Sequence, residues 1–235
     1  MAENVTSSFS PSKLEQKRVS VLAGSSPDAA VQVTAECTGP ASPPLPTSVH
    51  PDISHVHFSA AEIDARTREM GREISLAYTG VDDLLVLGVL KGCFVFLADI
   101  VRAIDPVPNG MTVDFIKASS YGGGVSSSGE VKVNMNVDSE RIKGKHILLV
   151  EDIVDTAHTI TKLRACLLAD GALDVKVVTL LDKVEGRQLA YVPDFVGFRC
   201  PNEFVVGFGL DFDEKYRSLP YIGVLRPHVY AHLNL

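Results

Sequence analysis

The sequence predicts an α/β fold built on a mainly parallel, doubly wound sheet. Apolar runs without polar alternation at residues 84–90, 147–150 and 175–181 indicate strands that are buried on both faces. Segments with helical spacing of apolar residues separate these runs, and strands that alternate with helices favour parallel pairing. Shorter apolar runs near the C-terminus predict a smaller appended subdomain.

Two helices are predicted from their capping residues and apolar stripes. Ser59 and Glu62 form a capping box, so the first helix begins at residue 59. The second helix follows the strand at 147–150 and stops at Gly171. The apolar stripes are Ile63, Met70, Ile74 and Ala77 in the first helix, and Ile160, Leu163, Leu167 and Leu168 in the second.

The other predicted elements are a sheet-packed helix and a set of short strands. The helix is apolar on nearly all sides at residues 93–104. A Gly/Ser-rich segment at residues 119–129 separates two of the strands. The strands are expected at residues 111–118, 131–137, 195–198, 204–209 and 222–225.

The two parts of the chain differ in composition. Residues 1–50 contain clustered Ser, Thr and Pro without a periodic apolar pattern, so they cannot bury enough surface to offset the entropy of ordering. We therefore expect a disordered N-terminal extension over residues 1–50 and one folded domain over residues 51–235. The chain has 235 residues, of which 46% are apolar, and this content allows a substantial core.

Charge and cysteine content exclude several classes of protein. The formal net charge of −7 disfavours a nucleic-acid surface, which usually carries a basic stripe. No apolar stretch approaches the roughly 20 residues that a membrane helix needs, and the N-terminus lacks the pattern of a signal peptide. The four cysteines are widely spaced, which favours reduced thiols. We expect a cytoplasmic protein that has no nucleic-acid or membrane partner.

An acidic segment follows the buried strand at 147–150. Glu151, Asp152 and Asp155 precede Thr156 and Thr159 at the predicted start of a helix. Ligands bind at the carboxyl edge of such sheets, and helix N-termini favour anions. The acids can bind sugar hydroxyls or magnesium, and the backbone amides and threonine hydroxyls can bind phosphate. The segment therefore predicts a sugar-phosphate site. The alternatives are solvated loop acids and a response-regulator receiver, which draws its acids from separate strands.

Other segments are ambiguous when each is considered alone. Lys91-Gly92 after a strand is usually a turn, and residues 119–129 form either a hairpin connection or a lid over substrate. Lys183 could be a surface lysine at a strand end. Asp211 and Arg217 could belong to a surface ion-pair network.

Taken together, these segments resemble a 6-oxopurine phosphoribosyltransferase of the hypoxanthine-guanine type. The resemblance covers roughly residues 55–230 and implies a type I phosphoribosyltransferase fold whose hood subdomain comes from both ends of the chain. Its most specific pieces are VEDIVDT at 150–156, PDFVGF at 193–198, NEFVVG at 202–207 and LDF…YR at 210–217. The first is a phosphoribosyl diphosphate motif, and the others are specific to purine salvage.

The resemblance assigns the sugar-phosphate contacts. It implies that Glu151 and Asp152 hold the ribose hydroxyls, directly or through Mg²⁺, and that Asp211 helps hold a second Mg²⁺. The diphosphate would lie against a loop of Leu90, Lys91 and Gly92, which contains a cis peptide in this family, and against Arg217. The lid would contain Ser120 and Tyr121. The 5′-phosphate would be held by Thr156, Ala157, His158 and Thr159.

The resemblance also assigns the purine contacts. Asp155 would accept a proton near purine N7, Lys183 would donate to the 6-oxo group, Phe204 would stack on the ring, and the Val205 backbone would meet its edge. An ammonium group only donates, so it would disfavour the amino group of adenine. The implied reaction joins the phosphoribosyl group of phosphoribosyl diphosphate to N9 of hypoxanthine or guanine and releases diphosphate. Homodimers or homotetramers are expected by analogy.

Three features depart from the family pattern. Ala157 stands where glycine is commonest, and Glu203 stands where relatives are often basic or neutral. A carboxylate at 203 leaves open a xanthine-using or broad-specificity enzyme, as does the long N-terminal extension. Ala231-His232-Leu233 resembles a peroxisomal address, but two residues follow it, so cytoplasm remains the expectation.

Two other functions remain as rivals. A non-catalytic sensor of phosphoribosyl diphosphate would be expected to lose Asp155 or the purine contacts. A diphosphokinase of the same fold would have no use for Lys183 beside Phe204.

Overall fold

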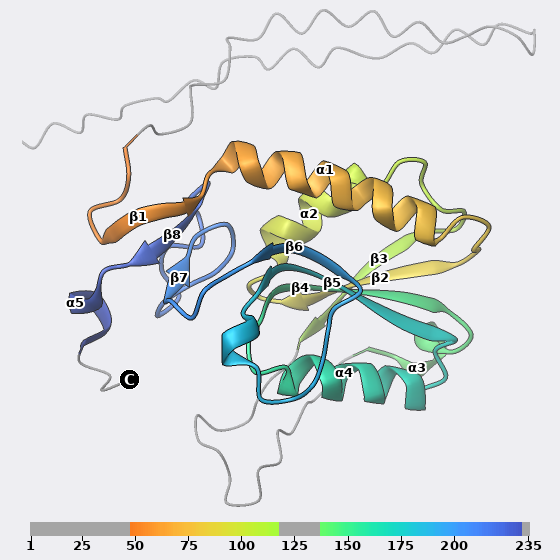
Figure 1. Ribbon diagram of the computed structural model, residues 1–235. Coiled ribbons are helices and arrows are strands. Elements are labelled where there is room, and N and C mark those ends of the chain that lie inside the picture. The colour runs from red at the N-terminus through yellow and green to blue at the C-terminus, as the bar shows by residue number, and fades with distance from the viewer. Residues whose placement is uncertain (1–47, 118–136, 232–235) are drawn as a thin grey trace, which may run out of the picture. The chain divides into compact units, whose positions relative to one another are not determined.

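The computed structural model describes residues 48–117 and 137–231 (Figure 1). Two separate sheets form within this part of the chain. The elements in order are β1 (Ile53–Phe58), α1 (Ala60–Ala77), β2 (Leu84–Leu90), α2 (Phe94–Ala103), β3 (Thr112–Lys117), α3 (Ser139–Ile142), β4 (His146–Val154), α4 (His158–Ala169), β5 (Asp174–Asp182), the 3₁₀ turn η1 (Val184–Gly186), β6 (Phe195–Arg199), β7 (Val205–Val206), β8 (Ile222–Leu225) and α5 (Pro227–Tyr230).

The larger sheet has five strands in the order β3-β2-β4-β5-β6. Every neighbouring pair in it is parallel, as the alternation of strands and helices predicts. All carboxyl ends of these strands therefore meet along one edge. The predicted α/β class is confirmed, and β2 has the bounds that its apolar run predicts.

Helices cover both faces of this sheet. Figure 1 shows α1 and α2 on one face and α3 and α4 on the other. Successive residues of β4 supply both cores, because strand side chains alternate in direction. Leu148 and Val150 pack with α1 and α2, whereas Ile147 and Leu149 pack with α3 and α4.

The smaller sheet has the order β1-β8-β7 with antiparallel pairing. It joins the first described strand to the C-terminal strands and lies beyond one end of the parallel sheet (Figure 1). This hood agrees with the predicted appended subdomain. Its own core contains Ile53, Val206, Tyr221 and Leu225.

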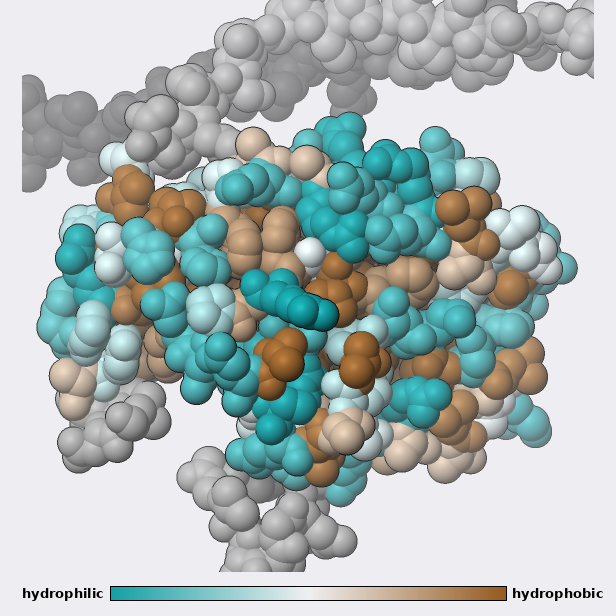
Figure 2. Space-filling model, in the orientation of Figure 1, coloured by the Kyte–Doolittle hydropathy of each residue, from teal (hydrophilic) through white to brown (hydrophobic). Residues whose placement is uncertain are grey.

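The capping box of α1 is formed as predicted, with Ser59 at the N-cap and Glu62 bonded back to the Ser59 backbone. The outer side of this helix is mainly hydrophilic (Figure 2). Within the described residues, no helix combines the length and apolar character that crossing a bilayer requires.

Some element predictions were wrong in detail. Ala77 is exposed, and Tyr78 is buried at that end of α1 instead. Leu168 is 37% exposed, because the buried face of α4 consists of Ile160, Leu163 and Leu167. The strand predicted at 204–209 is only Val205–Val206, since positive-φ residues at 207–209 turn the chain. The strand predicted at 131–137, the Gly/Ser segment and almost all of the N-terminal extension lie outside the described residues.

Candidate functional site

Two acidic residues lie inside the last part of β4. The strand is apolar through Val150 and stays paired with β5 beyond it, with Glu151 opposite Thr179 and Ile153 opposite Leu181. This pairing holds the backbone of Glu151 and Asp152 at the carboxyl edge of the sheet. Gly92 lies against Asp152, and a Cβ at position 92 would overlap the Asp152 Oδ2 atom.

Burial alters the charge of both acids. Burial raises the pKa of Glu151 well above its usual range, and the Asp152 carboxylate adds to that shift. Burial also raises the pKa of Asp152 to about 6, against backbone hydrogen bonds and the charge of Arg217. Asp152 Oδ1 accepts from Ile153 N at 2.9 Å, whereas Glu151 Oε2 has no partner among the described residues.

The loop after β4 ends at the N-terminus of α4. Ala157 is the N-cap residue, with φ of 70° and ψ of 6°, and it makes no side-chain cap. The first amides of α4 are therefore available to an anion, as at other helix N-termini. Thr156 O accepts hydrogen bonds from Gln188 N and Leu189 N, and His158 Nε2 lies 3.0 Å from Gln188 Oε1, so the 184–189 segment holds this loop.

A cleft of about 680 Å³ lies between the parallel sheet and the hood. Two of its positive groups, those of Lys91 and Arg217, already have acidic neighbours. Lys91 Nζ lies 3.1 Å from Glu214 Oε2, and Arg217 Nη2 lies 2.9 Å from Asp211 Oδ1. The lining residues are Leu90, Lys91, Gly92, Lys117, Asp152, Asp211, Glu214 and Arg217.

The floor of this cleft is fixed by main-chain geometry. The peptide bond between Leu90 and Lys91 is cis, as the resemblance implies. Gly209 has φ of 101°, and a Cβ there would overlap the Gly92 carbonyl oxygen. The hood backbone therefore touches the loop after β2 directly. Arg217 Nη1 donates to Gly209 O at 2.9 Å and supports the same contact.

Asp155 and Lys183 form the other end of the site. Lys183 Nζ lies 3.7 Å from Asp155 Oδ2, and their side chains are 12% and 47% exposed, respectively. Lys183 N donates a hydrogen bond to Val154 O at 3.0 Å, which joins the loop after β5 to the loop after β4. A Cβ at Gly186 would overlap Asp155 Oδ1, so only glycine leaves the carboxylate its position.

Two aromatic residues accompany the hood strand β7. Phe204 is half-buried, and one face of its ring stacks on Tyr230 with a centroid distance of 5.1 Å. Phe212 meets the Phe204 ring edge-on at 5.3 Å. Val205 is buried within the three-stranded sheet. These contacts leave no room for Phe204 to stack a ligand on the face that Tyr230 covers.

Comparison with known proteins places these residues in one family. The family described as the phosphoribosyl transferase domain matches residues 59–213. This chain belongs to that family. The matched segment contains β4 with its acids, the loop after β2, Lys183 and Asp211.

Curated relatives and solved structures narrow the likeness. A hypoxanthine-guanine phosphoribosyltransferase of Lactococcus lactis is 49% identical over 178 residues, which are 76% of this chain and 94% of that protein. A bifunctional protein, TilS/HprT, of Listeria innocua is 45% identical over 78% of this chain. The matched segment is only 28% of that longer protein. The solved Trypanosoma cruzi hypoxanthine phosphoribosyl transferase aligns with a TM-score of 0.72 and 40% identity, covering 80% of this chain and 98% of that one. The predicted resemblance is thus confirmed.

The phosphoribosyltransferase site suits Mg²⁺ in its donor chemistry. Magnesium prefers hard oxygen ligands and is held through one or two carboxylates. Glu151 presents a buried oxygen that has no partner in residues 48–117 or 137–231, and Asp152 and Asp211 line the same cleft. Asp211 is already engaged, because Oδ1 meets Arg217 and Oδ2 accepts from Glu214 N at 2.9 Å. It would reach a cation only by sharing one of these partners.

The structure brings together most of the predicted contacts. Six of them line the cleft: Leu90, Lys91, Gly92, Asp152, Asp211 and Arg217. Asp155 is joined to Lys183, while Phe204 and Val205 lie in the hood at the start of β7. Ser120 and Tyr121, the proposed lid residues, lie outside the described part of the chain.

Three charged residues of this phosphoribosyltransferase were missed in the sequence. Lys117 ends β3 at the same sheet edge, and Glu214 lies between Asp211 and Arg217 in the sequence. Their positions in the sequence could therefore have indicated that both residues line the cleft. Arg187 pairs with buried Asp182 behind Lys183. Burial lowers the pKa of Arg187, and the charge of Asp155 opposes that shift.

Proposed function

We propose that this phosphoribosyltransferase acts in purine salvage. It would transfer the phosphoribosyl group of phosphoribosyl diphosphate to N9 of hypoxanthine or guanine, giving IMP or GMP and diphosphate, with Mg²⁺ as cofactor. The observation that carries the proposal is the position of β4. Asp152 of this strand lines the cleft that Lys91 and Arg217 also line, and the loop that follows brings Asp155 to Lys183.

The sugar end would bind and orient the activated pentose. In their ionised forms Glu151 and Asp152 accept hydrogen bonds and cannot donate them, so they suit the ribose hydroxyls or a cation. The first amides of α4 would hold the 5′-phosphate. Bound magnesium would add positive charge beside the diphosphate. Lys91 and Arg217 would exchange their contacts with Glu214, which is exposed, for contacts with the leaving group.

The base end would activate and select the purine. Lys183 would donate to the 6-oxo group, and Asp155 would accept the proton at N7 as N9 attacks C1′. Their 3.7 Å separation would let both groups hydrogen-bond along the same edge of one planar base, where the 6-oxo group and N7 are neighbours. A closed site would also exclude water, which competes with the purine for the activated sugar.

The proposal extends to assembly and location. We propose a homodimer or homotetramer in the cytoplasm. The solved Trypanosoma cruzi relative was studied for the effect of its C-terminal region on oligomeric state and activity. Light scattering after size-exclusion chromatography tests the assembly of this chain, and a monomeric mass would refute it.

Steady-state kinetics with four bases tests the main proposal. Hypoxanthine, guanine, xanthine and adenine are compared at saturating phosphoribosyl diphosphate and Mg²⁺. We expect turnover with hypoxanthine and guanine, little with adenine, and loss of turnover when a chelator removes the metal. A preference for xanthine would replace the proposal with the xanthine-using alternative. Binding of phosphoribosyl diphosphate without turnover of any base would favour the non-catalytic sensor.

A further inference from the structure

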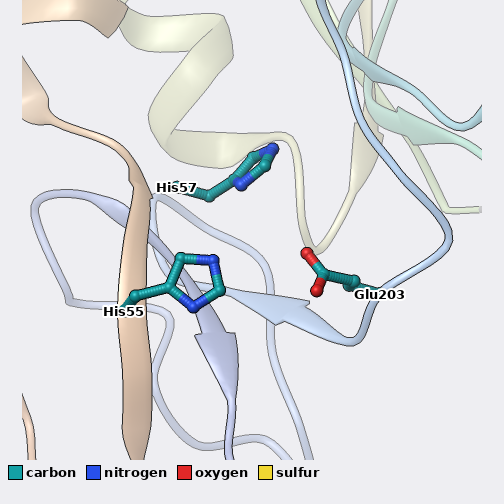
Figure 3. A group of neighbouring side chains, drawn as sticks. All are labelled: His55, His57 and Glu203. Atoms are coloured by element: carbon teal, nitrogen blue, oxygen red, sulfur yellow. The ribbon is translucent and has the colours of Figure 1, made fainter.

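Two histidines and a glutamate converge on the hood, outside the cleft. His55 and His57 lie on β1, and Glu203 lies on the segment before β7. Their ligand atoms all lie within 4.8 Å of one another. Figure 3 shows the Glu203 carboxylate directed toward the two imidazole rings. None of the three has a role in the reaction proposed above.

Irregular pairing of β1 with β8 positions the histidines. The register skips Ser54 and then His57, so the strand contains two bulges. A bulge re-aims the side chains around it and is common beside functional sites. The two rings lie with centroids 6.1 Å apart at an interplanar angle of 65°, which leaves their nitrogen atoms free to face a common point.

The contacts of the three residues leave them available. Within residues 48–117 and 137–231, no ion pair or hydrogen bond joins Glu203 to either histidine. The weak contact of His55 uses only Nδ1, which lies 3.4 Å from Ser54 Oγ on the exposed surface. His57 is partly buried and the other two side chains are exposed, so an ion could enter from solvent.

We propose that His55, His57 and Glu203 bind a divalent transition-metal ion of the Zn²⁺ type. Two imidazoles and one carboxylate form a common zinc ligand set that leaves the fourth position to water. Ligand atoms around tetrahedral Zn²⁺ lie about 3.3 Å apart. Side-chain rotations that move these atoms by about 1 Å would therefore close the site. Mg²⁺ demands oxygen ligands and would not compete here.

Such an ion would tie two distant parts of the chain together. It would link strand β1 to the segment that ends at Phe204. Phe204 is one of the hood residues proposed to contact the purine. The metal would therefore stabilise the hood against opening. An ion that binds only the folded state raises its free energy of unfolding by RT ln(1 + L/Kd), where L is the free ion concentration.

Titration of the full chain with Zn²⁺ in excess Mg²⁺ tests the site, because Mg²⁺ occupies the oxygen-rich acids of the cleft. Isothermal calorimetry should show one Zn²⁺ bound by the wild type, and Zn²⁺ should raise its Tm. The double variant His55→Ala/His57→Ala should lose at least about 100-fold in affinity, since even outer-shell changes typically cost about 10–100-fold. Glu203→Gln should bind more weakly than the wild type.

The matched control is His228→Ala, which removes an exposed histidine on α5. It should bind Zn²⁺ as the wild type does. Circular dichroism of the metal-free proteins checks that each variant folds. Equal Zn²⁺ affinity and equal Tm shifts in the wild type and the double variant would overturn the proposal.

Discussion

The two ends of the acidic segment differ in how their carboxylates are balanced. Glu151 and Asp152 are removed from water, and burial raises the pKa of both. Asp155, three residues later, is half exposed and has Lys183 3.7 Å away. Asp155 therefore has an ion-pair partner of its own. The cleft cations Lys91 and Arg217 instead pair with Glu214 and Asp211, and the charge of Arg217 only partly offsets the burial of Asp152.

This difference indicates which end is preformed. A buried carboxyl without a cation stays protonated more readily, because the charged form loses hydration. A cation or hydroxyl donors that reach Asp152 and Glu151 would therefore favour the charged forms of both. Asp155 is oriented by Lys183 and by the glycine at 186. Four predictions test this contrast, beginning with the largest effect.

Replacing Asp155 with Asn removes the proposed proton acceptor and keeps its shape. General acid–base groups typically contribute about 10²–10⁴-fold in rate, so we expect turnover to fall by that order. Affinity for phosphoribosyl diphosphate should change little, because the sugar end is separate. Single-turnover kinetics together with a binding titration measures both quantities. Undiminished turnover would mean that the base end is not where the proton goes.

Replacing Lys183 with Ala leaves Asp155 without its cation. A hydrogen bond to a charged group contributes about 1.5–3 kcal/mol, so the KM for hypoxanthine should rise by about 10–100-fold. The affinity for phosphoribosyl diphosphate in the same variant is the internal control. Equal losses for the two substrates would show that Lys183 serves the whole site rather than the base end.

The pH dependence of stability tests the sugar end. Asp152 titrates near 3.8 when unfolded and near 6 when folded, so the folded state holds an extra proton between these values. Its contribution to stability is fully present below pH 3.8 and is lost as pH rises through about 6. Asp152 is partly exposed to the cleft, so we expect a loss of about 1–3 kcal/mol without ligand.

Denaturant unfolding of the wild type and of Asp152→Asn from pH 4 to 7 measures this contribution. As pH rises, the free energy of unfolding of the wild type should fall relative to that of the variant. Added Mg²⁺ with phosphoribosyl diphosphate should reverse the shift in the wild type, since ligands of the charged form stabilise it. A constant difference across this range would show that Asp152 is not held partly protonated.

Ala157 in the loop between the two ends gives the smallest predicted effect. Its left-handed backbone costs an L-residue about 1–2 kcal/mol, which glycine would relieve. Loss of the buried methyl and added freedom of the unfolded chain offset part of this gain. We expect Ala157→Gly to be more stable by up to about 1 kcal/mol, or about 2–4 °C in Tm, by thermal unfolding. A lower Tm would show that packing outweighs backbone strain here.

The parallel sheet was predictable from the sequence because its strands are continuous apolar runs. Leu84–Leu90 and Ile222–Leu225 have the predicted bounds, and Ser59 marks the start of α1. Strand β1 was missed, since Ile53–Phe58 mixes three polar residues with apolar ones and its bulges break the period of two. Side-chain pairing between residues far apart in the chain, such as Tyr216 with Asp52, has no signal in the sequence.

The acids of the site were predictable for a related reason. Their positions follow a strand end, and strand ends in a parallel sheet converge on one edge. The pairing of Lys91 with Glu214 was not predictable, because it depends on how the hood folds over the sheet. The His55–His57–Glu203 cluster depends on the same arrangement together with two bulges.

The backbone contact between Gly92 and Gly209 has a consequence for redesign. The gap between hood and sheet is set there by main chain against main chain, with no side chain between them. Rotamer changes therefore cannot widen it. Accommodating a bulkier leaving group would require a different loop length on one side, because a side chain added at either glycine would meet a position that is already occupied.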